Sequence, residues 1–96
     1  MNIQQVELNK FTNYGKTPKF DALEASLLKY GFLSPVIFTA DMKPIDGVNR
    51  VATVLNSSKL QEIYQTIPTI IFDVDEDERS RLIGLIYENR LMPKQI

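Results

Sequence analysis

The chain has 96 residues, 44% hydrophobic and 24% charged, and we expect a single globular domain over residues 1–96. Its 11 basic and 12 acidic residues give a net charge of −1, which argues against a basic surface that grips duplex DNA. The absence of Cys and His excludes disulfides, thiolate nucleophiles, imidazole bases and zinc sites built from these side chains. Any catalysis must therefore use carboxylates, Lys, Ser, Thr, Tyr or a hard cation held by oxygen ligands.

The sequence shows no targeting signal. No apolar stretch reaches the roughly 18 residues of a membrane span. The N-terminus also lacks a basic region followed by an apolar run, which a secretory signal would need. We therefore expect a cytoplasmic location.

The chain opens with a short strand and a loop. Ile3, Val6 and Leu8 recur at strand-like spacing and predict a strand over residues 3–8. The segment 9–19, which contains Gly and Pro, is typical of a loop.

A capped helix is predicted next. Asp21 and Glu24 have the spacing of a capping box, and Phe20 just before them is placed as a hydrophobic staple. Leucines at helical spacing follow, and Gly31 is a typical stop, so we predict a helix over residues 22–30.

The middle of the chain alternates strands and helices. The β-branched and aromatic run 33–39 predicts a strand, and a turn at 40–43 leads to a second short strand at 44–45. An amphipathic pattern predicts a helix over residues 49–57, and residues 60–65 are typical of a helical turn or a loop.

The last third predicts a strand and a long helix. Residues 66–72 form a continuous apolar run, which indicates a strand buried on both faces. The acidic run that follows contains Asp75 as a predicted N-cap and Glu78 as its capping-box partner, which favours a solvated helix start over a metal cluster. Pro93 is expected to end the helix. Its apolar side is formed by Leu82, Ile83, Leu85, Ile86, Leu91 and Met92.

This order of elements predicts an α/β (α+β) domain in which a small mixed β-sheet packs with three main helices. The Tyr and Phe residues are spread along the chain, which favours packing roles over a base-stacking platform.

The segment from Pro44 to Leu55 is the first candidate site. Here a strand turns on Asp46-Gly47 and continues as a helix with Arg50 in its first turn. A helix N-terminus offers N–H groups and the positive end of the helix dipole to an anion, and a guanidinium can hold a phosphate through two hydrogen bonds. The same residues are also ordinary turn and cap chemistry, so both interpretations stay open.

Asn89 is the second candidate. It falls on the same helical stripe as Leu82 and Ile86, where a polar amide must be hydrogen-bonded. It either satisfies a nearby backbone loop or lines a site together with Glu88 and Arg90.

An ordered set of segments resembles a known family. Tyr30-Gly31-Phe32-Leu33-Ser34-Pro35-Val36-Ile37 is followed by Ile45-Asp46-Gly47-Val48-Asn49-Arg50-Val51-Ala52, then by Ile67-Pro68-Thr69-Ile70-Ile71, an acidic helix start and Glu88-Asn89-Arg90. In this order and spacing the chain resembles the N-terminal domain of ParB-type partition proteins, within the ParB/sulfiredoxin superfamily. The resemblance covers roughly residues 3–92.

The resemblance implies a nucleotide, CTP or ATP, bound with Mg²⁺. The box residues that would hold the phosphates are Gly47, Val48, Asn49 and Arg50, through the Arg50 side chain and the N–H groups of residues 47–50. Ser34 and Pro35 would lie near the base or ribose, and Glu88 with Asn89 would organise the metal. Asp46 and Glu88 are the candidate catalytic carboxylates. The implied setting is DNA partition, plasmid or phage biology, or DNA modification.

The box also departs from the family pattern. Partition proteins usually carry Gly-Glu-Arg-Arg, whereas this chain has Gly47-Val48-Asn49-Arg50, and the missing acid and arginine bear on CTP hydrolysis and on triphosphate affinity. Sulfiredoxin activity is excluded because its box needs a Cys. The sequence contains no helix-turn-helix or dimerisation part, so we expect a stand-alone module or an excised domain that meets DNA only weakly or through an attached domain.

Three functions follow. The first is a nucleotide-binding domain with slow triphosphatase or phosphotransfer activity. The second is a non-catalytic module that keeps the fold and pairs with a protein partner or with itself. The third, which trails the others, is a metal-dependent nuclease using Asp46 and Glu88.

Overall fold

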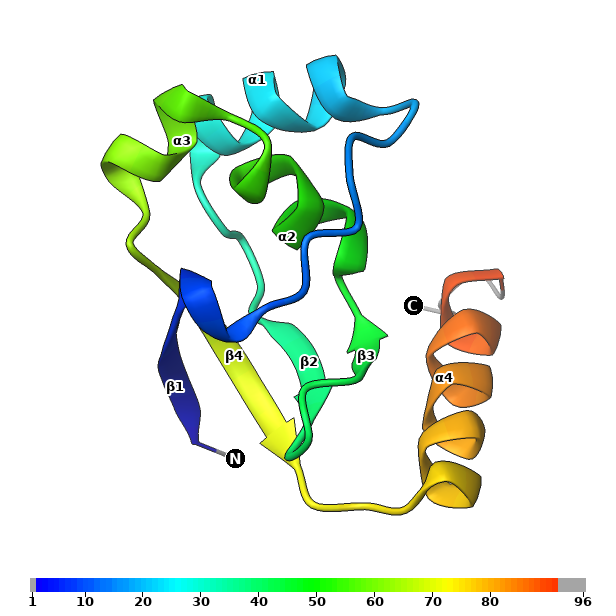
Figure 1. Cartoon of the computed structure of the whole chain (residues 1–96). Helices are drawn as coiled ribbons and strands as arrows, with labels where there is room; N and C mark the ends of the chain where they lie inside the picture. The colour runs from blue at the N-terminus through cyan, green and yellow to red at the C-terminus, as the bar shows by residue number, and fades with distance from the viewer. Residues whose placement is uncertain (1, 92–96) are drawn as a thin grey trace.

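The computed structural model describes residues 2–91, which form one four-stranded sheet and four α-helices (Figure 1). The strands are β1 (Ile3–Glu7), β2 (Val36–Thr39), β3 (Pro44–Asp46) and β4 (Thr66–Phe72). The helices are α1 (Phe20–Tyr30), α2 (Val48–Leu55), α3 (Ser58–Ile63) and α4 (Glu76–Leu91), with a 3-10 turn η1 at Leu8–Lys10. The predicted mixed α/β fold is confirmed, with a fourth helix, α3, in addition to the three that were predicted.

The sheet has the order β1-β4-β2-β3. β4 pairs antiparallel with β1 and parallel with β2, while β3 pairs antiparallel with β2 at the far edge. Because β3 runs opposite to β2 and β4, it returns toward the helices, and α2 begins where β3 ends (Figure 1). This reversal places the Asp46-Gly47 turn beside α2.

The core lies between the sheet and the first three helices. Its buried side chains come from every layer, namely Phe11, Leu27, Val36, Phe38, Val51, Val54, Leu60 and Ile67. Phe11, from the loop after η1, meets Phe38 of β2 edge to face with ring centroids 5.0 Å apart. Aromatic pairs prefer this arrangement, and the contact fixes the loop that crosses in front of the sheet.

α4 stands beside β3, apart from the other helices (Figure 1). Its attachment includes a hydrogen bond from Arg79 Nε to the Pro44 carbonyl, at 2.9 Å, and the half-buried side chains of Leu82, Ile83 and Ile86. Leu85, predicted on the apolar side, is 52% exposed. Within residues 2–91, no helix is both long and apolar enough to cross a membrane.

The start of α1 differs from the prediction. The helix begins at Phe20, with Lys19 at the N-cap, so Asp21 lies in the first turn and does not cap it. Glu24 is not a capping-box partner, because its Oε2 accepts a hydrogen bond from the Ser57 hydroxyl at 2.6 Å. A long-range partner therefore replaces the local one.

The central boundaries also shift. β2 begins at Val36 instead of residue 33, because Leu33 and Ser34 form a bend before Pro35, which has no N–H to donate. α2 spans Val48–Leu55 rather than 49–57, and Ser57 instead caps α3 by accepting a hydrogen bond from the Leu60 N–H at 3.1 Å.

β4 is not uniformly buried. Ile67 and Thr69 are fully buried, but Pro68 and Ile70, on the opposite face, are only half-buried, because the helices cover one face of the sheet. The predicted cap of α4 is confirmed, since Asp75 Oδ1 accepts a hydrogen bond from the Glu78 N–H at 2.8 Å. Pro93 and Met92 lie outside the described residues.

Candidate functional site

The turn between β3 and α2 requires glycine at position 47. Gly47 has a φ of 94°, in the left-handed region that L-residues with a side chain rarely adopt. A Cβ at this position would lie 2.6 Å from Val36 Cγ1 and 2.9 Å from Arg50 Nη2. Glycine thus allows the backbone of the turn to approach both the core and the guanidinium.

The N-terminus of α2 presents fewer donors than the sequence suggested. The N–H groups of Arg50 and Val51 both donate to the Gly47 carbonyl, at 3.1 and 3.2 Å. In this structure the Arg50 N–H is therefore already engaged within the first turn of α2. The N–H groups of Val48 and Asn49 belong to the first turn of α2, where a helix supplies no acceptor of its own.

Arg50 holds the turn to the segment between α1 and β2. Its Nη1 donates to the Ser34 carbonyl at 2.6 Å and lies 3.4 Å from Ser34 Oγ. Its Nη2 lies 4.0 Å from Asp46 Oδ2, and these two side chains are only 20% and 16% exposed. The structure thus brings together Ser34, Asp46, Gly47 and Arg50, as the sequence predicted, and it adds a specific hydrogen bond between two of them.

Two hollows meet at Arg50. One, of about 360 Å³, is lined by residues 44–50 and by Ile83 of α4. The other, of about 260 Å³, lies between α1 and the connection to β2 and is lined by Arg50, Ser34 and mostly apolar side chains. These further residues are Leu23, Ser26, Leu27, Gly31 and Leu33. Pro35, half-buried, follows Ser34 and leads into β2. Both hollows have a mixed polar and apolar lining, and the second adds leucine side chains beside Arg50.

Glu88 and Asn89 do not line either hollow. Both are exposed, near the C-terminal end of the described part of α4, whereas Ile83 is the α4 residue that reaches the box. Five to six residues of helix separate them from Ile83, about 8 Å along the axis. The expectation that Asn89 faces the core is wrong, because α4 packs beside the edge strand β3 and its outer turns extend past the sheet.

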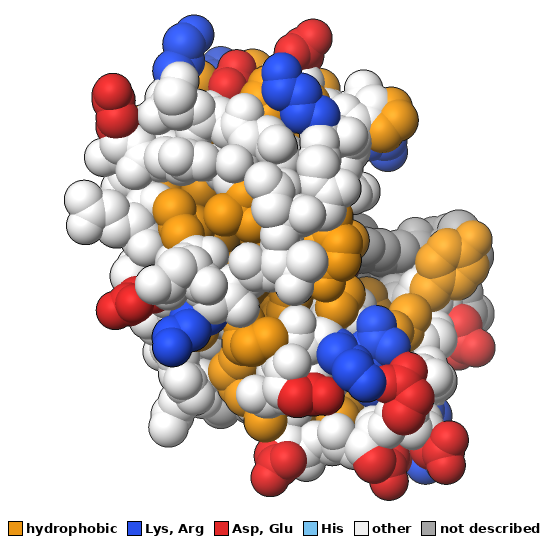
Figure 2. All heavy atoms as spheres, in the orientation of Figure 1, with side chains coloured by type: hydrophobic (Ala, Val, Ile, Leu, Met, Phe, Trp, Pro, Cys, Tyr) orange, Lys and Arg blue, Asp and Glu red, His pale blue; other side chains and the backbone are white. Residues whose placement is uncertain are grey.

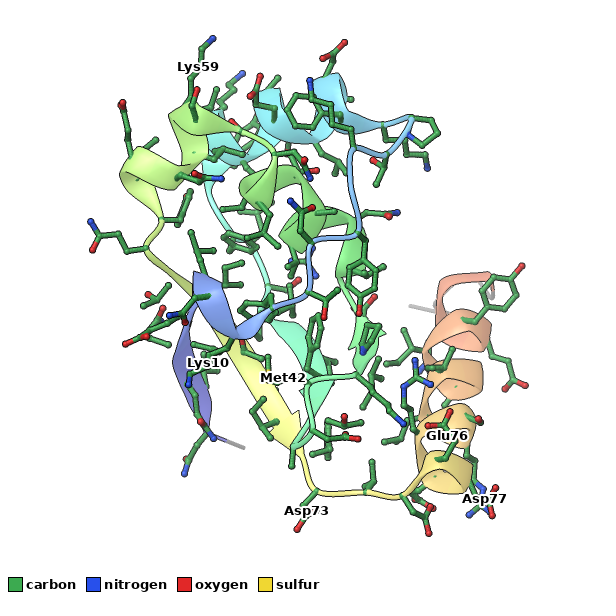
Figure 3. The ribbon with its side chains drawn as sticks, viewed as in Figure 1. Lys10, Met42, Lys59, Asp73, Glu76 and Asp77 are labelled. Atoms are coloured by element: carbon green, nitrogen blue, oxygen red, sulfur yellow. The ribbon has the colours of Figure 1, made fainter. Side chains whose placement is uncertain are left out.

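Acidic side chains gather where β4 leads into α4, with Asp73, Glu76 and Asp77 along this edge (Figure 3). Figure 2 shows blue basic side chains directly beside the red acidic ones here. The ion pairs join Lys43 to Glu76 at 3.6 Å and Arg79 to Glu76 at 2.8 Å. Across residues 2–91, no three acidic, Cys or His side chains come together in a way that would hold a metal ion. At this helix start Glu76 is therefore paired with two basic side chains.

An aromatic pair beside Arg50 was not identified from the sequence. Arg50 Cζ lies 5.8 Å from the centroid of the Phe32 ring, which is in turn edge to face with Tyr64, with centroids 5.2 Å apart. The three residues are far apart in sequence, and the aromatic positions were attributed to general packing. No local pattern could have joined them.

Comparison with solved structures defines the class of fold. The chain has the fold of the ParB N-terminal domain, with near-complete coverage in two matches. One is a Pnob8-like ParB-N domain, with a TM-score of 0.64 and 20% identity, covering 99% of this chain and 39% of the other.

The second is the C-terminally truncated chromosome-partitioning protein ParB from Caulobacter crescentus, complexed with CTP-gamma-S. It has a TM-score of 0.70 and 14% identity, covering 99% of this chain and 56% of the other. This chain thus spans between about two fifths and three fifths of these neighbours. No family model and no curated protein sequence matches it.

Proposed function

We propose that this domain binds a nucleoside triphosphate, CTP in the first instance, with its phosphates at the Asp46–Arg50 box. The observation that carries the proposal is the position of the Arg50 guanidinium directly over Gly47, at the N-terminus of α2. A helix N-terminus with a guanidinium beside it is a phosphate-binding arrangement. The same fold in the Caulobacter crescentus protein was solved with CTP-gamma-S, which supports this choice of ligand.

Each residue has a role in this proposal. Gly47 lets the turn pack closely against Val36 and Arg50, and the N–H groups of Val48 and Asn49 would donate to phosphate oxygens. Arg50 adds a charge-assisted hydrogen bond through Nη2, the edge that faces the box. The ribose or base would then extend toward Ser34-Pro35 and the leucine-lined hollow beside α1.

Mg²⁺ fits this site only as a shared ion. Glu88 and Asn89 offer one carboxylate and one amide oxygen, and both are exposed. Magnesium is commonly held by few carboxylates, with phosphate oxygens and water completing its shell. Because Glu88 and Asn89 line neither hollow, phosphate oxygens would be the direct ligands and this pair could act on the ion only through its bound waters. The ion would neutralise phosphate charge, and the two side chains would orient its water.

Hydrolysis, if it occurs, depends on carboxylates. Asp46 is the one beside the box and is the candidate to orient a water, with Glu88 as the second. Because Asp46 lies 4.0 Å from Arg50, it must serve both the guanidinium and the water. We therefore propose a slow triphosphatase at most.

The experiment is a thermal-shift titration with CTP, ATP, GTP and ADP, each with and without Mg²⁺. A ligand at about one hundred times its Kd adds roughly 2.7 kcal/mol of stability, and hence about 10 °C or more for a domain of this size. We expect a Mg²⁺-dependent shift with CTP in the wild type. Arg50→Ala should weaken binding about 10- to 100-fold, since it removes a hydrogen bond to a charged group.

A matched control removes a cation elsewhere. Arg81→Ala deletes an arginine that is 70% exposed and paired with Glu78 at 3.2 Å. Arg81 lines neither of the two hollows at Arg50. It should bind CTP as the wild type does. Asp46→Asn should keep or strengthen binding, because it removes a negative charge beside the phosphates, and should abolish any turnover. No shift with any nucleotide would refute the proposal.

A second candidate is a protein-interaction module. It is favoured by the apolar side chains that α4 leaves in solvent, with Leu85 at 52% and Tyr87 at 62% exposure. Sedimentation at increasing protein concentration, with and without CTP, separates the two. A concentration-dependent mass with no response to nucleotide would favour the module. In either case we propose a setting in DNA partition, plasmid or phage biology, or DNA modification.

A further inference from the structure

The guanidinium of Arg50 is confined on three sides. Nη1 donates to the Ser34 carbonyl at 2.6 Å, Nη2 lies 4.0 Å from Asp46, and the Phe32 ring centroid lies 5.8 Å from Cζ. Only 20% of the side chain is exposed. An arginine on a helix surface usually samples many rotamers, so the surrounding fold must restrict the rotamers of Arg50.

The Phe32 ring is itself held by a second residue. Tyr64, at the end of α3, presents its ring to Phe32 edge to face, at 5.2 Å and 87°. Gly31 makes room for this contact, because a Cβ there would lie 2.9 Å from the Tyr64 hydroxyl oxygen. The ends of α1 and α3 thus meet beneath the guanidinium.

We propose that Phe32 and Tyr64 are positioning residues that hold the Arg50 guanidinium over the box. The two rings form a wall, here called the aromatic support, and the Ser34 carbonyl fixes Nη1 so that Nη2 faces Gly47. The orientation of the anion-binding group is therefore set by the connection between α1 and β2, and not by α2 alone.

The aromatic support has a chemical advantage over a carboxylate. A ring face attracts a cation without cancelling its charge, whereas Asp46 partly neutralises it. The guanidinium is thereby ordered in advance and still carries its charge toward an anion. Ordering a side chain before binding removes that entropic cost from the binding step. This use of the support rests on the proposed nucleotide function, but the ordering of Arg50 does not.

The first test measures Arg50 in the nucleotide-free protein. Nitrogen NMR of the guanidinium reports its rotation about the Nε–Cζ bond, which we expect to be about 3- to 10-fold faster in Phe32→Leu. Phe32→Tyr, which keeps the ring, should restore the slow rotation. The control is Tyr30→Leu, which removes a ring from another cation–ring pair, with Lys29 at 5.1 Å from its centroid.

The second test is a double-mutant cycle on the CTP affinity. Phe32→Leu should weaken Mg²⁺-CTP binding about 3- to 10-fold in the wild type but have no further effect in Arg50→Ala, if Phe32 acts through that residue. Thermal unfolding of each variant checks that the fold is retained. Equal losses in both backgrounds would overturn the proposal, because they would assign Phe32 a general structural role.

The two proposals fail separately. If no nucleotide binds the wild type, the proposed function is refuted and the guanidinium rotation still decides the role of the aromatic support. If CTP binds but Phe32→Leu matches Tyr30→Leu in both rotation and affinity, the nucleotide site stands and the aromatic support is overturned.

Discussion

Replacing Gly47 with alanine tests how the box is built. At a φ of 94° an alanine pays about 1–2 kcal/mol for left-handed backbone strain. Its Cβ would also lie 2.6 Å from Val36 Cγ1, and Val36 is fully buried and cannot withdraw. Forcing a methyl group into a packed core costs about 1–3 kcal/mol. The sum is about 2–5 kcal/mol of unfolding free energy.

Alanine substitutions at two other glycines separate the cost of backbone strain from the cost of the clash with Val36. Gly15 has a φ of 83° but open space around its Cβ position, so Gly15→Ala pays the strain alone. Gly84 lies within α4 with nothing near its Cβ position, so Gly84→Ala should stabilise the chain by up to about 1 kcal/mol.

Thermal unfolding should therefore rank the variants. At roughly 4–8 °C per kcal/mol for a domain of this size, Gly47→Ala should lose about 10 °C or more, and Gly15→Ala about half of that loss. Gly84→Ala should unfold at or above the wild-type temperature. Equal losses for Gly47→Ala and Gly15→Ala would refute the claim that the box is pressed against the core.

Two further predictions concern hydrogen bonds away from the box. Ser57→Ala removes the hydroxyl that donates to Glu24 and accepts from the buried Leu60 N–H. It should lower the free energy of unfolding, measured with urea, by about 1–3 kcal/mol. A loss below about 0.5 kcal/mol, as at an ordinary surface site, would contradict this prediction. The Thr39 hydroxyl donates to the Asp41 carboxylate and lowers the pKa of Asp41. A lowered folded-state pKa contributes stability that is fully present above the unfolded value of about 4 and is lost as the pH falls through the folded-state pKa. The stability gap between wild type and Thr39→Val should therefore shrink from about pH 7 to about pH 3. A gap that is constant with pH would contradict this assignment.

Local patterns predicted what local forces decide. The apolar run 66–72 became β4 within the same bounds, and Asp75 caps α4, because a strand pattern and a capping side chain act over a few residues. The strand–turn–helix pattern predicted that Gly47 and Arg50 belong to one site, and the structure places the Arg50 guanidinium beside Gly47.

Long-range partners account for the sequence predictions that were wrong. Glu24 has the spacing of a capping partner but meets Ser57, which is 33 residues away. Asn89 lies on an apolar stripe by periodicity, yet that stripe is covered only where α4 meets β3. Periodicity identifies a face of a helix, but it cannot state how far along the helix a partner extends.

The charge of the box bears on how tightly it could hold a triphosphate. One guanidinium is offset by one carboxylate at 4.0 Å, so the side chains contribute almost no net charge. Long-range attraction for phosphates would then come from the helix dipole and from any Mg²⁺ bound with the nucleotide, while Arg50 would contribute a charge-assisted hydrogen bond at short range. Affinity at this site therefore depends on how accurately Arg50 is placed, which makes the residues that place it as important as the box itself.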